Sequence, residues 1–462
     1  MKNNKRNLES EFELVKKLLK LQRYSEAEII TTKILEASPN NIPYLSMLSL
    51  IHLKKNELKS AEKTLLRILS LSPNDVNSRV NLITLYFRDL QFDKVKSLVS
   101  HIKKNNEIKD YNYYLQIAKI CHKIGDYLNA KFFFHKSISL NPDDRRLKFF
   151  LSQTFLALGE WREGWNYFEY RIGVIVQNSI ANCTKILRNE IKYWQGENLN
   201  NKKILIFTEQ GYGDFIQFYK LIYEICDKYK SVNITLICKT ELIRVINEPN
   251  INIIEESNKE KLNIITADYW IFLMSIPYLL RLERENFNIS QPYIFPSNRK
   301  MKALTEIDKK RLKIGIVLKG NANHPNDANR SIDDFKVLEP LLNIENIDFY
   351  SLQKDTSPFS KTIFEKYRIK NLSNQINDFR DTADIISRMD LIISVDTSVV
   401  HLAGSMGINC FVLVPIINTD WRWLSLYNFY KSVKIFKQDK PNSWVEPILK
   451  IKKEIENLIN LS

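Results

Sequence analysis

The chain has 462 residues, of which 44% are hydrophobic and 26% are charged, and its formal net charge is +15 at pH 7. It is too long for one compact core, so we expect two or three globular domains of ordinary composition. No segment interleaves aromatic with basic residues as a nucleic-acid-binding module would, so we expect no nucleic-acid partner.

The five cysteines are scattered, odd in number and without a Cys-x-x-Cys pair. This pattern argues against a disulfide framework or a zinc site and favours a reducing compartment. The polar N-terminus predicts no signal peptide, and the most apolar segments are too short for a membrane span or contain Asp396 and His401. We therefore expect a cytoplasmic protein that is not transmembrane, with a peripheral position at the inner face of the membrane as an alternative.

Residues 1–171 repeat a short turn followed by a small residue. The small positions, 34 or 35 residues apart, are Ala27, Ala61, Val95, Ala130 and Gly164. A period of 34 with helical spacing of apolar residues is typical of tetratricopeptide repeats, in which helix pairs stack into a solenoid. The small residue allows the two helices of a repeat to approach each other. We therefore predict about five helix pairs in an all-α solenoid.

Residues 172–195 form the predicted connector, and strands alternate with helices from there onward. The alternation predicts an α/β fold with parallel sheets covered on both faces, in two Rossmann-like units at residues 196–297 and 298–462. Ligands of such units bind at the carboxyl ends of the strands, so we expect a site between the two units. We expect the final helix, from about residue 444 to 461, to cap or cross back over the first unit.

The first candidate motif is the segment EQGYGD at residues 209–214, directly after the strand ILIF. Its glycines, Gly211 and Gly213, permit a tight turn and the close approach of a ligand. Asp214 begins the next helix, where the carboxylate has either a chemical role or the common role of an N-cap. Spacing alone favours the N-cap, because a single Gly-x-Gly is weak support for a ligand site.

The second candidate motif is a polar loop at residues 319–331, which follows the strand KIGIVL. Arg330 can clamp a phosphate through its guanidinium fork. The alternative is a polar surface loop with a helix cap, and the sequence alone leaves the two interpretations evenly balanced.

The third candidate motif, at residues 391–423, is a strand–helix–strand pattern whose helix begins at Thr397 and Ser398. Unpaired backbone N–H groups and the helix dipole allow such a helix start to bind phosphate. His401, one turn later, is either a ligand-binding side chain or a histidine packed within the site. Trp421 follows the next strand, where its ring can wall a sugar or base or can pack in the core.

Several motifs are absent from the sequence. It contains no Asp-x-Asp, no Gly-x-x-x-x-Gly-Lys-Ser/Thr loop and no Gly-x-Ser-x-Gly elbow. These absences argue against a metal-dependent nucleotide-sugar site of the Asp-x-Asp kind, a P-loop ATPase and a hydrolase of the elbow type.

Taken together, these segments resemble bacterial tetratricopeptide-repeat proteins with a C-terminal glycosyltransferase domain similar to the ADP-heptose:lipopolysaccharide heptosyltransferases. The resemblance covers nearly the whole chain. The segments that carry it are EQGYGDFIQF (209–218), GNANHPNDANRSI (320–332), YSLQ (350–353), SVDTSVVHLAGSMG (394–407), DWRW (420–423) and KIFKQ (434–438).

The resemblance implies a GT-B fold and an inverting, metal-independent transfer of a sugar from a nucleotide-diphosphate sugar, with no metal and no cofactor. It implies that Asp214 is the base for the acceptor hydroxyl. The residues expected at the donor and its phosphates are Lys319, Asn321, Arg330, Ser331, Asp396, Thr397, Ser398 and His401. The residues expected in a substrate-binding loop are Gly211, Gly213, Gln217, Asp327, Gln353 and Trp421.

Two residues depart from the family pattern. Tyr212 stands where a smaller aliphatic residue is expected, and Lys319 stands where an aromatic or small residue is usual. These departures affect the expected identity of acceptor and donor more than the reaction class.

The sequence leaves two further functions open. One is an interaction protein whose repeats bind a peptide or protein on their concave face and whose α/β part binds a nucleotide sugar without turnover. The other is a protein O-glycosyltransferase similar to the repeat-bearing O-linked N-acetylglucosamine transferases. The acceptor is accordingly a glycan, a lipid or a protein.

Overall fold

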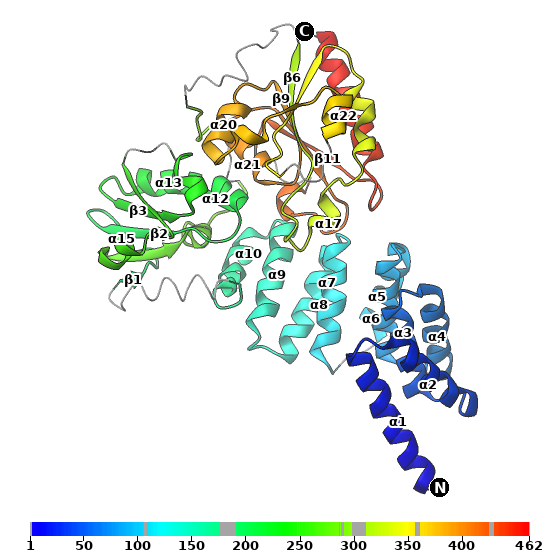
Figure 1. Ribbon diagram of the computed structural model, residues 1–462. Coiled ribbons are helices and arrows are strands. Elements are labelled where there is room, and N and C mark those ends of the chain that lie inside the picture. Colours follow the sequence, from blue (N-terminus) through cyan, green and yellow to red (C-terminus); the bar gives the residue numbers. More distant parts are fainter. Residues whose placement is uncertain are drawn as a thin grey trace. The chain divides into compact units, whose positions relative to one another are not determined.

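The computed structural model describes residues 2–105, 109–175, 191–246, 248, 250–285, 287, 291–297, 311–355, 361–424 and 429–461 (Figure 1). Most of the expected connector at residues 172–195 lies outside these described residues. The chain divides by its internal contacts into two compact units, Met1–Leu147 and Lys148–Ser462. The division by contacts falls after Leu147, inside a helix of the repeats, and so it coincides with neither of the domain boundaries expected at residues 171 and 297. Those two boundaries remain predictions.

The first unit consists of stacked helices joined in antiparallel pairs (Figure 1). Its helices are α1 (Lys2–Lys20), α2 (Tyr24–Ala37), α3 (Ile42–Lys54), α4 (Leu58–Leu71), α5 (Val76–Arg88), α6 (Phe92–Asn105), α7 (Tyr111–Lys123) and α8 (Tyr127–Leu140). A further pair, α9 (Arg145–Leu158) and α10 (Trp161–Phe168), continues the pattern into the second unit and is followed by the 3₁₀ turn η1 (Glu169–Arg171). The predicted succession of helix pairs is confirmed.

Turn chemistry explains why the repeats keep one spacing. Each helix pair is joined by a turn with one residue in the left-handed region. These residues are Gln22, Asn56, Leu90, Gly125 and Gly159, with φ between 58° and 83°. A left-handed residue ends a helix and reverses the chain within a few residues, and glycine adopts it without strain. The small residues that follow, such as Ala27 and Ala61, are fully buried between the paired helices.

The first sheet of the second unit has five parallel strands in the order β1-β5-β2-β3-β4. The strands are β1 (Lys192–Tyr193), β2 (Lys203–Phe207), β3 (Asn233–Cys238), β4 (Ile251–Glu255) and β5 (Tyr269–Phe272). The connecting helices are α12 (Tyr212–Phe218), α13 (Lys220–Lys228), α14 (Thr240–Ile243), α15 (Lys259–Ile264), η2 (Leu273–Ser275) and α16 (Ile276–Leu279). The apolar strand residues point into a buried core, as parallel sheets require.

The second sheet has six parallel strands in the order β11-β10-β9-β6-β7-β8. The strands are β6 (Leu312–Val317), β7 (Ile347–Ser351), β8 (Lys370–Asn371), β9 (Leu391–Val395), β10 (Cys410–Val414) and β11 (Val433–Lys437). The helices are α17 (Asp327–Arg330), η4 (Phe335–Leu338), α18 (Glu339–Leu342), α19 (Lys361–Lys366), η5 (Ser373–Gln375), α20 (Phe379–Ile386), α21 (Ser398–Ser405), η6 (Trp421–Trp423) and α22 (Val445–Leu461). Read from its first strand β6, this order is the Rossmann order, with its switch point between β6 and β9.

The C-terminal helix differs from expectation. Ile448, Ile451 and Ile455 of α22 are fully buried in the core of the second sheet, among residues such as Ile314 and Leu413. The helix therefore covers the second sheet, of which it is the C-terminal continuation, and does not cross back over the first sheet. The apolar residues of α22 recur at helical spacing and so form one apolar stripe along the helix. This stripe packs on the apolar face of the second sheet.

No helix within the described part of the chain is both long enough and apolar enough to span a membrane.

Candidate active site

The three sequence motifs all follow strands that flank a switch point. Residues 208–214 leave β2, residues 318–331 leave β6, and residues 396–398 leave β9. Helix α12 of the first sheet packs directly on helix α21 of the second sheet. The first turns of both helices therefore meet, with Gly213 beside Ser398 and His401. The structure brings the first and third motifs together at the junction of the two sheets.

Asp214 lies in the first turn of α12 and is not its N-cap, which is Gly211. One carboxylate oxygen, Oδ2, accepts a hydrogen bond from the backbone N–H of Gly211 at 3.0 Å. The other oxygen, Oδ1, accepts one from Nη2 of Arg422 at 2.5 Å. Asp214 therefore contributes to capping without being the N-cap itself, because its side chain accepts the hydrogen bond of the Gly211 backbone N–H. The same carboxylate also joins the two sheets through an ion pair.

Arg422 is the residue of this site that the sequence reasoning missed. Its Nε donates to Gln217 Oε1 at 2.6 Å, and its Nη1 donates to Asp420 Oδ2 at 3.0 Å. Burial opposes its charge, but the carboxylates of Asp420 and Asp214 outweigh burial and raise the pKa of Arg422 above its ordinary value. The available signal was a basic residue between two tryptophans just after a strand of the second sheet. Gln217 is fully buried, and its side-chain oxygen supports Arg422.

Gly213 permits close packing of two helices. A Cβ atom at this position would lie 2.8 Å from Cδ2 of His401 and 3.6 Å from the Cα of Ser398. The expected close approach of a ligand is therefore replaced here by the approach of helix α21. Gly211 has an ordinary φ of −84° and needs no special conformation.

His401 is packed within the site, which is one of the two roles the sequence left open. Its Nδ1 shares a hydrogen bond of 3.1 Å with the hydroxyl of Tyr430, and its ring lies 5.2 Å from that of Trp423. Burial, together with the nearby charge of Arg422, lowers the pKa of His401 to about 3. The imidazole is therefore neutral at physiological pH.

Gln353 shapes the loop that follows β6. Its Oε1 accepts hydrogen bonds from the backbone N–H groups of Leu318 and Lys319, at 3.3 and 3.1 Å. Its Nε2 donates to the carbonyl of Lys319 at 3.2 Å. The ammonium of Lys319 forms an ion pair with Asp333. Gln353 and Lys319 are therefore engaged within the protein.

The rest of this loop is held by short polar side chains. Ser331 Oγ accepts from the N–H of Gly320 at 3.0 Å and donates to Asp327 Oδ1 at 2.8 Å. Asn321 is exposed, and its side chain accepts from the N–H of Asn323. Asp327 and Ser331 therefore fix the loop conformation.

Arg330 connects the second motif with the third. Its Nη1 donates to the carbonyl of Asp396 at 2.9 Å, and its Nε donates to Asp327 Oδ1 at 3.3 Å. A Cβ atom on Gly320 would lie 2.5 Å from Arg330 Nη2, so only glycine leaves room for this guanidinium. Nη2 makes no hydrogen bond to any described residue. Arg330 thus has donors left for a ligand at the start of α21.

The start of α21 is partly accessible and carries a hydroxyl that no described residue engages. Thr397 is the N-cap, and its hydroxyl accepts from the N–H of Val399 at 3.3 Å and shares a hydrogen bond with Ser394. Ser398 is half-buried, and within the described residues its hydroxyl has no hydrogen-bond partner. Burial, with the nearby charge of Asp420, raises the pKa of Asp396 to about 6.

Trp421 belongs to an aromatic cluster. The members of this cluster are Trp161 and Trp165 of α10, Phe218 and Phe287 of the first sheet unit, and Trp421 and Phe429 of the second. The ring of Trp421 lies 5.7 Å from both Trp161 and Trp165 and is 5% exposed. Core packing, the alternative left open by the sequence, therefore describes Trp421 better than a sugar wall does.

The architecture defines a class. The helical repeats are tetratricopeptide repeats, and the two parallel Rossmann-like sheets that follow them form a GT-B fold. Residues 42–75 and 111–144 match the model of the tetratricopeptide repeat.

A curated relative and two solved structures are similar to this chain. Protein FlbA of Caulobacter vibrioides is 23% identical over 333 residues, which are 67% of this chain and 54% of FlbA. The chain thus spans about half the length of that relative. A glycosyl transferase family 9 structure from Veillonella parvula covers 58% of this chain and 100% of its own, at 12% identity and a TM-score of 0.45. A MamA structure covers 35% of this chain and 88% of its own, at 18% identity and a TM-score of 0.31.

Proposed function

We propose that this protein is an inverting, metal-independent glycosyltransferase that uses a nucleotide-diphosphate sugar as donor. One observation carries the proposal. The carboxylate of Asp214 from the first sheet lies at the junction where the anion-binding start of α21 and Arg330 come from the second sheet. A carboxylate facing an anion site across two Rossmann-like units fits a base for an acceptor hydroxyl opposite a leaving diphosphate.

The donor diphosphate binds at the start of α21. The helix dipole favours an anion there, and the hydroxyl of Ser398 and Nη2 of Arg330 supply donors that no described residue uses. As the bond between the sugar and the diphosphate breaks, negative charge develops on the departing phosphate. Donors already held in place by Asp327 and the Asp396 carbonyl stabilise that charge without reorganisation.

Asp214 takes the proton of the acceptor hydroxyl as the hydroxyl oxygen bonds to the anomeric carbon and the bond from that carbon to the diphosphate breaks. Each carboxylate oxygen accepts one hydrogen bond in the structure and has a second lone pair for the acceptor proton. Arg422 and the Gly211 N–H fix the direction in which this carboxylate points. Arg422 also balances the charges of Asp214 and Asp420, a task that a divalent cation performs in metal-dependent sites.

The test is an assay of nucleoside diphosphate release with a panel of nucleotide sugars and with glycan, lipid and peptide acceptors. Asp214→Asn is expected to lower turnover by about 10²–10⁴-fold while donor affinity persists. Arg330→Gln and Ser398→Ala are expected to weaken donor binding.

Asp420→Asn is the matched control for the assay. It removes another carboxylate partner of Arg422 but not the proposed base, so it should lower turnover far less than Asp214→Asn. Equal turnover by the wild type and Asp214→Asn would contradict the role of Asp214, and no donor binding at all would contradict the proposal as a whole.

A second candidate is an interaction protein with a nucleotide-sugar-binding module. The observation that favours it is the double engagement of Asp214 by Gly211 and Arg422, which suits a structural carboxylate. Donor binding by thermal shift without diphosphate release in any acceptor mixture would decide for this candidate.

A further inference from the structure

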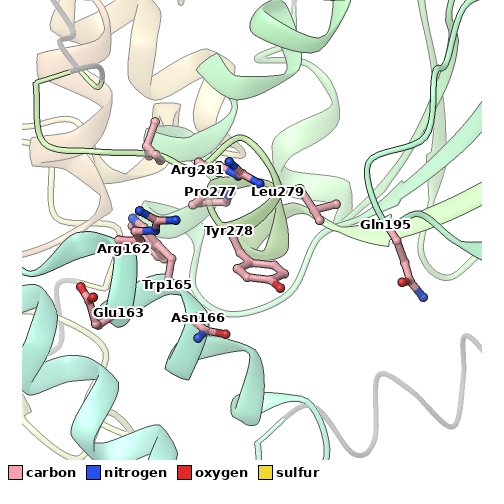
Figure 2. A pocket seen from close by; sticks show the side chains of 10 residues that line it. Arg162, Glu163, Trp165, Asn166, Gln195, Pro277, Tyr278, Leu279 and Arg281 are labelled. Atoms are coloured by element: carbon pink, nitrogen blue, oxygen red, sulfur yellow. The ribbon is translucent and has the colours of Figure 1, made fainter.

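A pocket of about 400 Å³ lies between the last repeat helix and the segment that follows β5. Helix α10 contributes Arg162, Trp165 and Asn166, and residues 277–282 contribute Tyr278 and Arg281 from the opposite side (Figure 2). No residue expected from the sequence to bind substrate lines this pocket. It is therefore separate from the candidate active site.

The pocket has an excess of unpaired positive charge. Within the described residues, neither Arg162 nor Arg281 takes part in an ion pair or a side-chain hydrogen bond. Glu163 is the one carboxylate in the lining and pairs with neither of them. Two exposed guanidinium groups near one hollow repel each other, and an oxyanion bound between them relieves that repulsion through charge-assisted hydrogen bonds.

The remaining lining suits hydroxyl groups and a ring. Figure 2 shows the phenol of Tyr278 and the amide of Asn166 facing the same space from the two sides, and neither makes a hydrogen bond with another described residue. Leu279, which is half-buried, supplies apolar surface against which the C–H face of a sugar can pack. The volume lies within the range of small-molecule sites and far exceeds that of a bare ion.

Arg281 is placed by an uncommon backbone conformation. Its φ is +49°, a left-handed value that usually belongs to glycine or asparagine at the end of a helix. The N–H of Leu282 bonds the carbonyl of Pro277 at 2.8 Å and closes the turn. The long cationic side chain of Arg281 extends from this turn and lines the pocket. The left-handed backbone of a non-glycine residue carries some strain.

We propose that this pocket binds a small acidic sugar, with its carboxylate or phosphate held by Arg162 and Arg281 and its hydroxyls held by Tyr278 and Asn166. Binding here does not depend on the proposed transferase activity. The two sources of the oxyanion, a uronic acid and a sugar phosphate, share one chemistry and are separated by the experiment.

The experiment is calorimetric titration of the full chain with four probes: glucuronate, glucose 6-phosphate, glucose and inorganic phosphate. At least one acidic sugar is expected to bind more tightly than both neutral glucose and bare phosphate. Arg162→Gln and Arg281→Gln are each expected to weaken that binding by about 10- to 100-fold, the value of one charge-assisted hydrogen bond. Which acidic sugar binds more tightly identifies the source of the oxyanion.

Two control variants locate the binding. Arg330→Gln alters the candidate active site, and Arg368→Gln alters an exposed arginine that has no ion pair among the described residues. Both should bind the acidic sugar as the wild type does. The proposal is overturned if neither acidic sugar binds, if glucose or phosphate binds as tightly, or if Arg330→Gln abolishes binding while Arg162→Gln and Arg281→Gln do not affect it.

Discussion

The guanidinium of Arg422 lies 2.5 Å from the carboxylate of Asp214, although 208 residues separate them in the chain. The pair joins the start of α12 in the first sheet unit to the segment after β10 in the second. Asp420 and Gln217 complete the coordination of the guanidinium. One arginine therefore fixes both the junction of the two sheets and the direction of the proposed catalytic carboxylate.

We predict that Arg422→Gln destabilises the second unit strongly. Removing one partner of a largely buried ion pair leaves the other charges without compensation and typically costs about 3–5 kcal/mol. The measurement is urea unfolding followed by tryptophan fluorescence. All seven tryptophans of the chain lie after residue 147, so this signal reports the second unit alone.

A double-mutant cycle separates this ion pair from the other contacts of Arg422. Asp214→Asn, Arg422→Gln and the double variant should show a coupling energy above about 0.5 kcal/mol, because the two side chains touch. The exposed Arg368→Gln serves as a control with little effect. Strictly additive losses would show that the two residues do not stabilise each other.

Much of the fold could be predicted from residue spacing. The 34-residue period identified the helical repeats, and the alternation of strands with helices identified two parallel sheets. Loops after parallel strands lie at the carboxyl edge, so the motifs at residues 209–214, 319–331 and 396–401 were expected near one another. The structure confirms that these three loops meet.

Long-range side-chain pairing could not be predicted in this way. The position of Arg422 between two tryptophans is a local signal, but it does not show that the guanidinium binds Asp214, 208 residues earlier in the chain. Gln353 lies in a resemblance motif, but its hydrogen bonds to the backbone of residues 318 and 319 depend on the pairing of β6 with β7. The burial of Trp421 depends on tryptophans of helix α10, more than 250 residues earlier.

We predict that Gly213→Ala forces helices α12 and α21 apart. The added methyl group would lie 2.8 Å from the ring of His401, which is itself held by Tyr430. Overpacking of this kind costs about 1–3 kcal/mol, and we also expect weaker donor binding because the start of α21 shifts. Urea unfolding and donor titration measure the two effects.

Gly211→Ala is the matched control for this substitution. It lies two residues away, has an ordinary φ and would meet only the carboxylate of Asp214, at 3.2 Å. It should lower the unfolding midpoint less than Gly213→Ala does. A larger loss for Gly211→Ala would mean that helix packing is not the reason for the glycine at position 213.

We predict that Trp421 stabilises the fold and does not contact the donor. Trp421→Ala removes a buried ring from the aromatic cluster and should cost about 3–5 kcal/mol, whereas Trp421→Phe should cost less. Unfolding of both variants is followed through the six remaining tryptophans. If Trp421→Phe instead weakens donor binding without lowering the unfolding midpoint, the ring is a wall of the sugar site.

We predict that His401 makes the second unit less stable on acidification. Its pKa is about 3 in the folded protein and near 6.5 in an unfolded chain, so between these values only the unfolded chain takes up a proton. The stability that the neutral imidazole contributes is complete above pH 6.5 and is lost as the pH falls toward 3. The slope approaches about 1.4 kcal/mol per pH unit.

His401→Gln tests this dependence, because glutamine does not titrate. The midpoint of urea unfolding, followed by tryptophan fluorescence at several pH values between 7 and 4.5, should fall more steeply on acidification for the wild type than for the variant.

Carboxyl groups with raised pKa values, such as Asp396 and Glu209, change the stability with pH in the opposite direction, but they are present in both proteins. His324→Gln is the comparison variant: burial and the charge of Arg330 also lower the pKa of His324, but its side chain is exposed, so this substitution should alter the slope less than His401→Gln does. Equal slopes for the wild type and His401→Gln would show that the imidazole takes up its proton as readily in the folded protein as in the unfolded chain. The assignment of a packed, neutral imidazole at this junction would then be wrong.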